Sequence, residues 1–192
     1  MMSNFPVHNT ESAPAASRET MAAVQKKFGF VPNLIGILAE SPAALKGYLT
    51  VADSFSGSSL SPVEQQVVLV ATSVENGCAY CVAAHSMLYR HAGGDEASLR
   101  ALREGEPIAD SRLEALRRFT REVVEKRGWA GEKSLRAFLD AGFTRPQVLE
   151  VILGVTQKTL SNYINHLAET PVDAAFGNFE WQPQTSAAHA AR

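Results

Sequence analysis

The sequence predicts an all-α protein, and three observations support this fold class. Apolar residues recur at helical spacing along most of the chain, and sustained alternation with period two is missing. Strong helix start signals precede two of the apolar runs, Ser61-Pro62-Val63-Glu64 and Thr144-Arg145-Pro146-Gln147. The turn signals are not spaced as they are in a β-sandwich, which argues against that class.

Caps and breakers divide the first half of the chain into five expected helices. Gly29 ends the first, and Ser41-Pro42 begins the third with an N-cap and a proline at the first helical position. The fourth is apolar almost all round, so we expect it to be central and buried. Asn76-Gly77 breaks the chain before the fifth. The five helices span approximately 18–28, 34–40, 42–55, 62–75 and 78–91.

The second half predicts four more helices, of which the last is the longest. Two charged amphipathic helices and a short one are expected at approximately 95–104, 110–127 and 133–140. The last begins after Thr144 and runs through the apolar residues Val151, Ile152, Val155, Leu160, Ile164 and Leu167. The chain is therefore divided into a mobile N-terminal segment, 1–17, a single helical domain, 18–176, and a C-terminal tail, 177–192.

Composition argues against several classes of protein. A chain of 192 residues with 45% apolar and 20% charged residues suits one soluble domain. Its net charge of −2, with Lys and Arg scattered, provides no basic surface for nucleic acid. Its apolar runs are too short to span a membrane, and its first residues lack the apolar core of a secretory signal. We therefore expect a cytoplasmic protein, in which a persistent structural disulfide would be unusual.

The residues most indicative of chemistry are Cys78 and Cys81, the two cysteines of the chain, in the segment Cys78-Ala79-Tyr80-Cys81-Val82-Ala83-Ala84-His85. On a helix, Cys78, Cys81 and His85 occupy positions i, i+3 and i+7, so all three project from one face. A close cysteine pair in a cytoplasmic protein is typical of catalysis or metal binding. Two sulfurs beside an imidazole indicate dithiol redox chemistry.

The two sulfurs are expected to have different roles. A thiolate is the reactive form of cysteine, and both a helix start and a neighbouring histidine lower the pKa of a thiol. Cys81, one turn before His85, is the better candidate for attack on a peroxide, with His85 as the acid/base. The attack leaves a sulfenic acid. Cys78 is placed to condense with that group to a disulfide, which an external dithiol would then reduce.

Two other interpretations of the cysteine pair stay open. Cysteine is often buried as a small hydrophobe, so both residues could serve packing alone. The pair could also bind zinc together with His85 and His91, although structural zinc sites usually combine two separated ligand pairs. A thioredoxin-like interpretation fails, because that motif requires a βαβ context.

Four further polar residues are candidates for the surroundings of the dithiol. Glu64 either completes a capping box with Ser61 or accepts a proton in the reaction. Tyr80, between the cysteines, either packs or extends a proton chain. Asn162 and His166, one turn apart on the last helix, either line the site or hold a helix end, since buried polar groups need partners.

Several of these motifs together resemble a known family. The runs Leu60-Ser61-Pro62-Val63-Glu64, Ala71-Thr72-Ser73 and Asn76 to His85 resemble the alkyl hydroperoxidase D (AhpD)-like group of the carboxymuconolactone decarboxylase superfamily. The stretch Thr159 to His166, with Thr170-Pro171, is similar to the peroxidase-related branch of that group. The resemblance covers approximately 28–176. It implies an AhpD-like helical fold, assembly into trimers or hexamers, and peroxide reduction in which Cys81 attacks the peroxide and Cys78 resolves.

The sequence departs from the family pattern at two positions. The family's proton relay has a glutamate twelve residues before the first cysteine, where this chain has Gln66. Glu64 points about 200° away from that position on an ideal helix. The family also has a histidine directly before the second cysteine, where this chain has Tyr80. The partners of the two thiols therefore differ from the family's.

The function expected from the sequence is thiol-dependent reduction of a small-molecule hydroperoxide. The sequence contains no recognisable site for flavin, haem or nicotinamide, so no cofactor is expected and the electrons would come from an external dithiol of thioredoxin or lipoyl type. A homo-oligomer is expected from the resemblance. Two alternatives are a non-catalytic redox-sensing oligomer, and a lactone decarboxylase of the same superfamily, whose chemistry does not require thiols.

Overall fold

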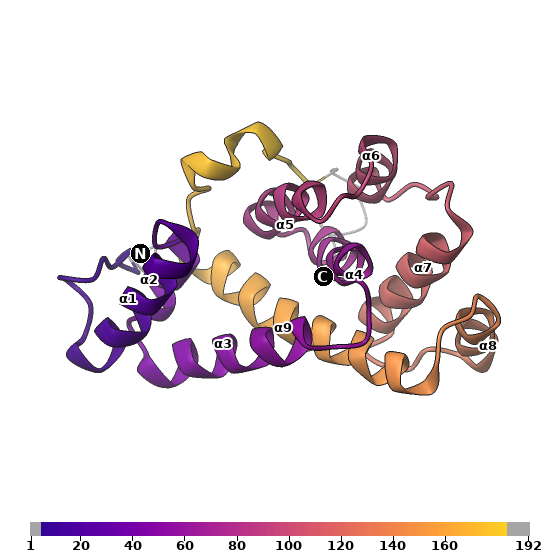
Figure 1. Ribbon diagram of the computed structural model, residues 1–192, viewed down its shortest axis with the longest axis horizontal. Coiled ribbons are helices and arrows are strands. Elements are labelled where there is room, and N and C mark those ends of the chain that lie inside the picture. Colours follow the sequence, from indigo (N-terminus) through magenta and orange to yellow (C-terminus); the bar gives the residue numbers. More distant parts are fainter. Residues whose placement is uncertain (1–4, 184–192) are drawn as a thin grey trace.

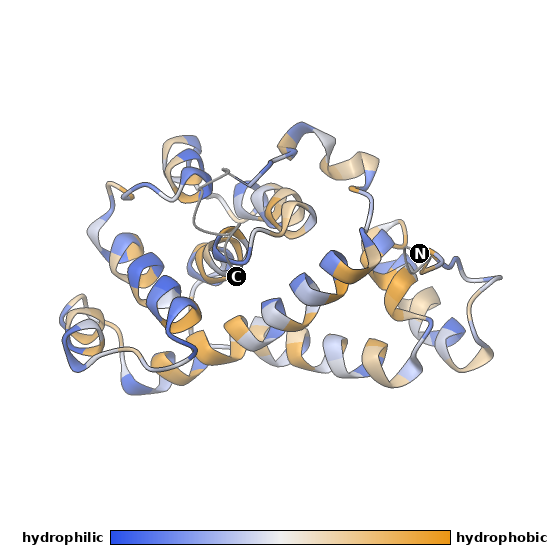
Figure 2. Ribbon diagram, turned by 180° about the vertical axis from the view of Figure 1, so that it is seen from behind, coloured by the Kyte–Doolittle hydropathy of each residue, from blue (hydrophilic) through white to orange (hydrophobic). Residues whose placement is uncertain are grey.

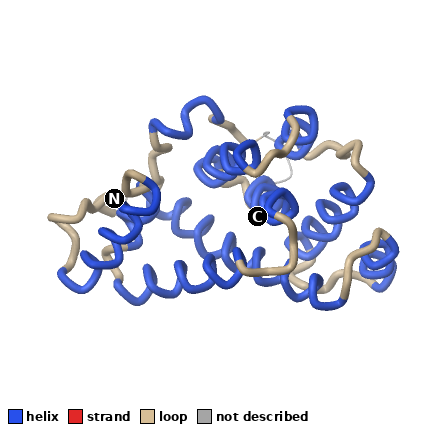
Figure 3. Tube along the Cα trace, viewed as in Figure 1, coloured by secondary structure: helices blue, strands red, loops and turns tan. Residues whose placement is uncertain are grey.

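The protein folds as a set of helices, without a strand in the part of the chain described by the computed structural model, residues 5–183 (Figures 1 and 3). The all-α prediction is therefore confirmed. The elements are α1 (Ala15–Phe28), α2 (Asn33–Leu38), α3 (Pro42–Ser56), α4 (Pro62–Glu75), α5 (Ala79–His91), α6 (Glu96–Glu104), α7 (Ser111–Glu125), α8 (Glu132–Asp140), α9 (Arg145–Ala168) and the 3₁₀ helix η1 (Ala174–Phe179).

Helix α4 lies at the centre of the fold, seen end-on in Figure 1, as its apolar sequence predicts. It packs against α5, α7 and α9, and Val67, Val68 and Val70 are completely buried. Its neighbour α7 is amphipathic and carries mostly hydrophilic residues in Figure 2. The core thus forms around one helix without a polar face, and helices with a polar face cover it.

Side-chain caps fix where the two most important helices begin. The Ser61 hydroxyl accepts from the Glu64 N–H while the Glu64 carboxylate accepts from the Ser61 N–H, which is a complete capping box. Thr144 and Gln147 form the same arrangement at the start of α9. Between α4 and α5 the break falls at Gly77, whose φ of 70° is left-handed, and Cys78 follows as the N-cap of α5.

The observed boundaries differ from the expected ones mainly near the two ends. Helix α1 begins three residues before the expected Arg18, and the Ser17 hydroxyl donates to the Ala39 carbonyl at 2.7 Å. Toward the C-terminus, η1 is an element that the sequence did not predict. Trp181 then donates from its indole Nε1 to the Arg103 carbonyl at 3.0 Å. The expected tail lies outside the described residues from 184 onward.

Helix α9 crosses the molecule beside α3 and α4 and approaches them closely at Gly154 (Figure 1). A Cβ placed on Gly154 would lie 2.7 Å from Val68 Cγ1 and 2.8 Å from the Phe55 ring. No helix of the described residues is both long and apolar enough to cross a membrane.

We expect Gly154→Ala to lower the free energy of unfolding by about 1–3 kcal/mol, because the added methyl group overpacks this contact. Gly47→Ala is the matched control, since a Cβ on Gly47 in α3 meets no atom within 4 Å. It should raise the free energy of unfolding by about 0.5–1 kcal/mol through helix propensity. Urea denaturation measures both changes, and equal stability of the two variants would contradict the packing described.

Candidate active site

The two cysteines lie at the start of α5 and are buried as free thiols. Cys78 is the N-cap and Cys81 lies in the first turn, and each is only 1% exposed. The Asn76-Gly77 break therefore places the pair where unpaired backbone N–H groups favour an anion. The dithiol at a helix start is the arrangement that the sequence predicts.

His85 forms its hydrogen bonds with Gln66 and Lys158 rather than with either sulfur, which differs from the role expected for it. Its Nδ1 lies 2.9 Å from Gln66 Oε1, and its Nε2 lies 2.9 Å from the Lys158 ammonium. Because the Gln66 carbonyl oxygen can only accept, Nδ1 carries the proton and Nε2 presents a lone pair to Lys158. Burial and the charge of Lys158 both lower the pKa of His85 well below its usual range, which agrees with a neutral ring.

Lys158 belongs to the site but is not among the residues expected from the sequence. Its side chain is completely buried on α9, where an unpaired ammonium would be costly. Burial lowers its pKa, but the neighbouring Cys81, Tyr48 and Cys78 more than offset burial, so the pKa of Lys158 is raised. Lys158 is therefore a buried cation held between a sulfur anion and the neutral His85.

The electrostatics separate the two thiols. Burial would raise the pKa of Cys81, but hydrogen bonds from Cys78 and Ser161 and the charge of Lys158 overcome it and lower that pKa well below its usual range. The pKa of Cys78 is raised, first because its thiol hydrogen-bonds to Cys81 and second because it is buried. These opposite shifts favour a thiolate on Cys81 that accepts a hydrogen bond from the Cys78 thiol.

Helix α9 supplies the remaining contacts to the sulfurs from a polar face that is buried. The Asn165 amide donates to Cys81 Sγ at 3.1 Å and to Cys78 Sγ at 3.7 Å, and Ser161 Oγ lies 3.7 Å from Cys81 Sγ. With Lys158 at position i, Ser161 and Asn165 occupy positions i+3 and i+7 of α9. The three side chains therefore share one side of the helix. On the opposite side Leu160 is 37% and Tyr163 57% exposed.

The polar pair expected on α9 divides into two separate roles. Asn162 is buried, and it accepts from the Asn76 amide at 2.9 Å and donates to Ser73 Oγ at 3.4 Å. It therefore holds the C-terminal end of α4. His166 is exposed, and the structure does not bring it to the sulfurs. Asn165, its neighbour in sequence, takes the position at the dithiol.

Tyr80 is engaged with the C-terminal segment. Its hydroxyl donates to Asp173 Oδ2 at 2.6 Å and accepts from the Leu34 N–H at 3.3 Å. Asp173 also accepts from the Asn33 N–H at the start of α2. Burial, followed by the hydrogen bond to Asp173, raises the pKa of Tyr80. Tyr80 thus joins α2, α5 and the segment before η1, and Phe176 packs edge-on against its ring.

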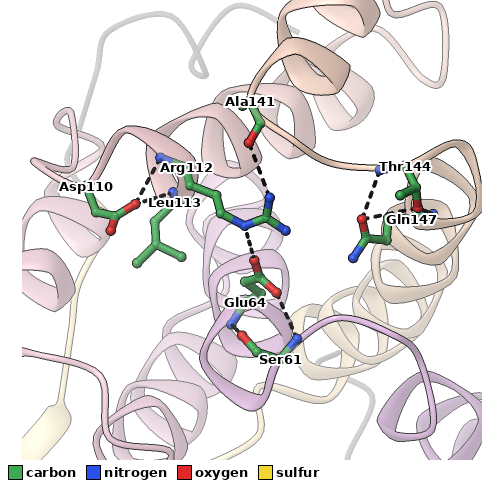
Figure 4. A network of polar contacts seen from close by, with 8 residues as sticks. All are labelled: Ser61, Glu64, Asp110, Arg112, Leu113, Ala141, Thr144 and Gln147. Atoms are coloured by element: carbon green, nitrogen blue, oxygen red, sulfur yellow. Dashed lines mark hydrogen bonds and ion pairs between the residues drawn. The ribbon is translucent and has the colours of Figure 1, made fainter.

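Glu64 is occupied by contacts outside the dithiol cluster, as Figure 4 shows. One carboxylate oxygen accepts from the Ser61 N–H at 2.8 Å, and the other accepts from Arg112 Nε at 2.7 Å. Arg112 in turn lies over the Phe143 ring, 3.8 Å from its centroid. The expectation that Glu64 accepts a proton in the reaction receives no support from these contacts. Gln66, two residues further along α4, contacts His85 instead.

We expect Glu64→Gln to lower the free energy of unfolding by about 1–2 kcal/mol, because the ion pair with the half-exposed Arg112 is lost. The rate at which Cys81 is alkylated should stay within a factor of two of the wild-type rate. Thermal denaturation and iodoacetamide labelling measure the two effects. A large loss of labelling with unchanged stability would instead assign Glu64 to the reaction.

The geometry bears on the zinc interpretation as well. Among residues 5–183 no group of three or more His, Cys, Asp and Glu side chains is placed to share a metal ion. The nitrogens of His85 face Gln66 and Lys158 rather than the sulfurs. The residues around the dithiol therefore fit an anion at Cys81 better than a metal centre.

A cavity of about 690 Å³ opens beside Cys81, with α1, α3, α4, α5 and α9 contributing to its wall. Cys81, His85, Gln66 and Lys158 line it, whereas Cys78 does not. Most of the rest of the wall is apolar, including Phe30, Tyr48, Leu49, Phe55, Leu69 and Phe176. A molecule in this cavity would meet Cys81 before Cys78.

Comparisons with known proteins identify one matching family and several structures with a similar fold. Residues 39–122 match the carboxymuconolactone decarboxylase family, and none of the curated proteins matches the chain. An AhpD-core, peroxidase-related protein from Ralstonia eutropha JMP134 superposes with a TM-score of 0.82, at 24% identity over 96% of this chain and 99% of that one. A peroxidase-related protein from Silicibacter sp. TM1040 gives 0.78, at 19% identity over 91% and 93%.

A third similar structure is that of an enzyme described as a debrominase. The debrominase Bmp8, as a cysteine-to-alanine variant in complex with 2,3,4-tribromopyrrole, superposes with a TM-score of 0.77, at 12% identity over 93% of this chain and 96% of that one. These structures confirm the fold that the resemblance implied: this chain has an AhpD-like helical fold, and its residues 39–122 match the carboxymuconolactone decarboxylase family.

Proposed function

We propose that this protein is a thiol-dependent peroxidase that reduces organic hydroperoxides through a Cys78/Cys81 dithiol–disulfide cycle. The observation that carries the proposal is the division of charge within the pair. Cys81 has a lowered pKa beside the buried Lys158 cation, and Cys78 keeps its proton and donates to Cys81. A stabilised thiolate next to a protonated thiol is the starting state for peroxide reduction.

The first step breaks the O–O bond of the peroxide. The Cys81 thiolate attacks the terminal peroxide oxygen, and the alkoxide leaves with the bonding electron pair. Lys158 gives this alkoxide a proton, which yields the alcohol, a Cys81 sulfenic acid and a neutral amine. His85 accepts a hydrogen bond from Lys158 at 2.9 Å, and Gln66 fixes its tautomer. Both residues therefore position the proton donor.

The second step closes the disulfide. Cys78 passes its proton to the neutral Lys158 and attacks the sulfenic sulfur, and the departing hydroxide takes that proton back to form water. The products are the disulfide, water and an uncharged Lys158. An external dithiol then returns two electrons and two protons, which regenerates the Cys81 thiolate, the Cys78 thiol and the Lys158 ammonium. Asn165, which donates to both sulfurs, holds them together for this exchange.

We extend the proposal to the reductant, the oligomeric state and the cellular compartment. The reductant is a dithiol of thioredoxin or lipoyl type, the chain assembles as a trimer or hexamer, and the protein works in the cytoplasm. The oligomer and the reductant rest on the resemblance to AhpD-like proteins.

The test is peroxide consumption by wild-type protein with tert-butyl hydroperoxide and a dithiol donor, either dihydrolipoamide or reduced thioredoxin. We expect turnover that saturates with peroxide and is absent from a Cys78→Ser/Cys81→Ser double variant. Peroxide consumption equal to that of the double variant with every donor would overturn the assignment. The redox-sensor alternative predicts a change in oligomer size on oxidation without turnover, which light scattering separates from catalysis.

Reduction of a carbon–halogen bond is a second candidate, and the cavity is the observation that favours it. A volume of about 690 Å³ beside Cys81 has room for a halogenated ring as well as a peroxide. The Cys81 thiolate would take the halogen as a cation, the carbanion would take a proton, and Cys78 would displace halide to give the disulfide. Incubation with tribromopyrrole and a dithiol decides this candidate by bromide release.

A further inference from the structure

The cavity beside Cys81 has a closed end and an open mouth with different chemistry. At the closed end Cys81, Gln157 and Lys158 line the wall, and none is more than 5% exposed. At the mouth the lining includes two exposed lysines, Lys27 at the end of α1 and Lys46 on α3. Apolar side chains form most of the wall between them. The volume of about 690 Å³ lies in the range of sites for small organic ligands.

The charges at the mouth favour an anion. Neither Lys27 nor Lys46 forms an ion pair with a carboxylate among the described residues, and Lys27 Nζ instead lies 5.6 Å from the centroid of the Phe28 ring. The lining contains one opposing charge, Asp53, which forms no ion pair with either lysine. Two ammonium groups against one carboxylate leave a net positive mouth on a chain whose overall charge is −2.

One acceptor at the closed end, the side-chain oxygen of Gln157, lacks a hydrogen-bond donor among the described residues. Gln157 is 5% exposed, and its Oε1 is buried without a hydrogen-bond partner in the described part of the chain. A buried carbonyl oxygen of this kind is costly unless a donor reaches it. The neighbouring Lys158 donates to His85 rather than to Gln157. A hydroxyl or hydroperoxyl group of a bound molecule would supply the missing donor beside Cys81.

We propose that this cavity binds an amphipathic carboxylic acid, with its carboxylate at Lys27 and Lys46 and its hydroperoxyl group at Gln157 and Cys81. The hydroperoxide part of this inference rests on the proposed function. The step is the two-electron reduction described above: the O–O bond breaks, the dithiol becomes a disulfide, and the products are water and the hydroxy acid. The hydroxy acid keeps both recognition groups, so it binds to the same site as the product.

Binding can be tested without any turnover, using the reduced wild-type protein and three ligands of equal length. Calorimetry with ω-hydroxydecanoic acid, decanoic acid and decanol separates the two ends of the site. We expect the hydroxy acid to bind most tightly and decanol to bind roughly tenfold more weakly than decanoic acid, with the difference shrinking as salt rises. Equal binding of decanol and decanoic acid would overturn recognition of the carboxylate, and no binding of any ligand would overturn the site.

Two variants and a matched control test which residues recognise each end of the ligand. Lys27→Gln/Lys46→Gln should remove the preference for decanoic acid over decanol. Lys26→Gln/Lys133→Gln removes the same charge from lysines outside the cavity and should keep the preference. Gln157→Leu should remove the preference for the hydroxy acid over decanoic acid. Loss of preference in the control, or retention in the other two, would contradict the proposal.

These results are independent of the peroxidase assay. If hydroperoxide turnover fails while the binding preferences hold, the proposed function is wrong and the cavity is a site for a carboxylic acid. If turnover succeeds and binding does not distinguish acid from alcohol, the proposed function stands and this inference is wrong.

Discussion

Replacing Lys158 with Met is expected to slow alkylation of Cys81 by iodoacetamide roughly 10- to 100-fold at pH 7. The buried ammonium lowers the pKa of Cys81, and removing an opposite charge at this range shifts a pKa by about one to three units. Methionine is chosen because it keeps the length and packing of the buried stem. The reactive thiolate therefore becomes a minor species at neutral pH in the variant.

The pH dependence of the alkylation rate shows whether Lys158 lowers the pKa of Cys81. In the wild type the pKa of Cys81 lies well below the usual thiol range, so its rate should stay high as the pH falls from 9 to 7. In Lys158→Met the rate should fall over the same interval, because the thiolate is protonated there. Lys133→Met, on the exposed surface of α8, is the control and should keep the wild-type profile. Superposable profiles for all three proteins would contradict the role of Lys158.

Serine substitutions of the two cysteines are expected to differ in how much hydroperoxide the reduced protein consumes. Cys81→Ser should lose all reaction with hydroperoxide, because Cys78 does not line the cavity and its burial still raises the pKa of its thiol. Cys78→Ser should consume one equivalent of peroxide and stop at a sulfenic acid, since the resolving thiol is gone. Steady-state turnover should fall at least about 100-fold in both variants.

Dimedone labelling followed by mass spectrometry distinguishes these outcomes. The label should appear on Cys81 in the Cys78→Ser variant and should be absent from the wild type, where the disulfide forms. A label on Cys78 in the Cys81→Ser variant would reverse the two roles.

Most of the fold follows from local signals in the sequence. Capping boxes at Ser61 and Thr144, and the Asn76-Gly77 break, determine helix starts through bonds within a few residues, and the observed helices begin there. The 3₁₀ helix η1 was not predicted, because its position depends on Asp173 reaching Tyr80 and Asn33, far away in the sequence.

The site was only half predictable, and α9 explains why. The cysteines are marked by their spacing, but Lys158, Ser161 and Asn165 look like surface residues of an amphipathic helix. In the structure this polar side is buried, because it faces the sulfurs and His85, while Leu160 and Tyr163 on the other side are exposed. A signal was present: a lysine, a serine and an asparagine recur at spacings of three and four along that helix.

Gln66 shows a second limit of sequence reasoning. Glutamine stands where the family has a glutamate, and the sequence left Glu64 either as part of a capping box or as a proton acceptor. The structure places Gln66 at His85 and pairs Glu64 with Arg112. A neutral amide suits a neutral imidazole there, because the charge that Cys81 needs comes from Lys158, which lies 92 positions after Gln66 in the sequence.

The most direct test of the account is a stoichiometric oxidation of the reduced wild-type protein without any reductant. One equivalent of an organic hydroperoxide should be consumed, and both thiols should disappear together as a Cys78–Cys81 disulfide identified by mass spectrometry, with one equivalent of alcohol formed. Two free thiols remaining beside unreacted hydroperoxide, or oxidation of Cys78 alone, would contradict it.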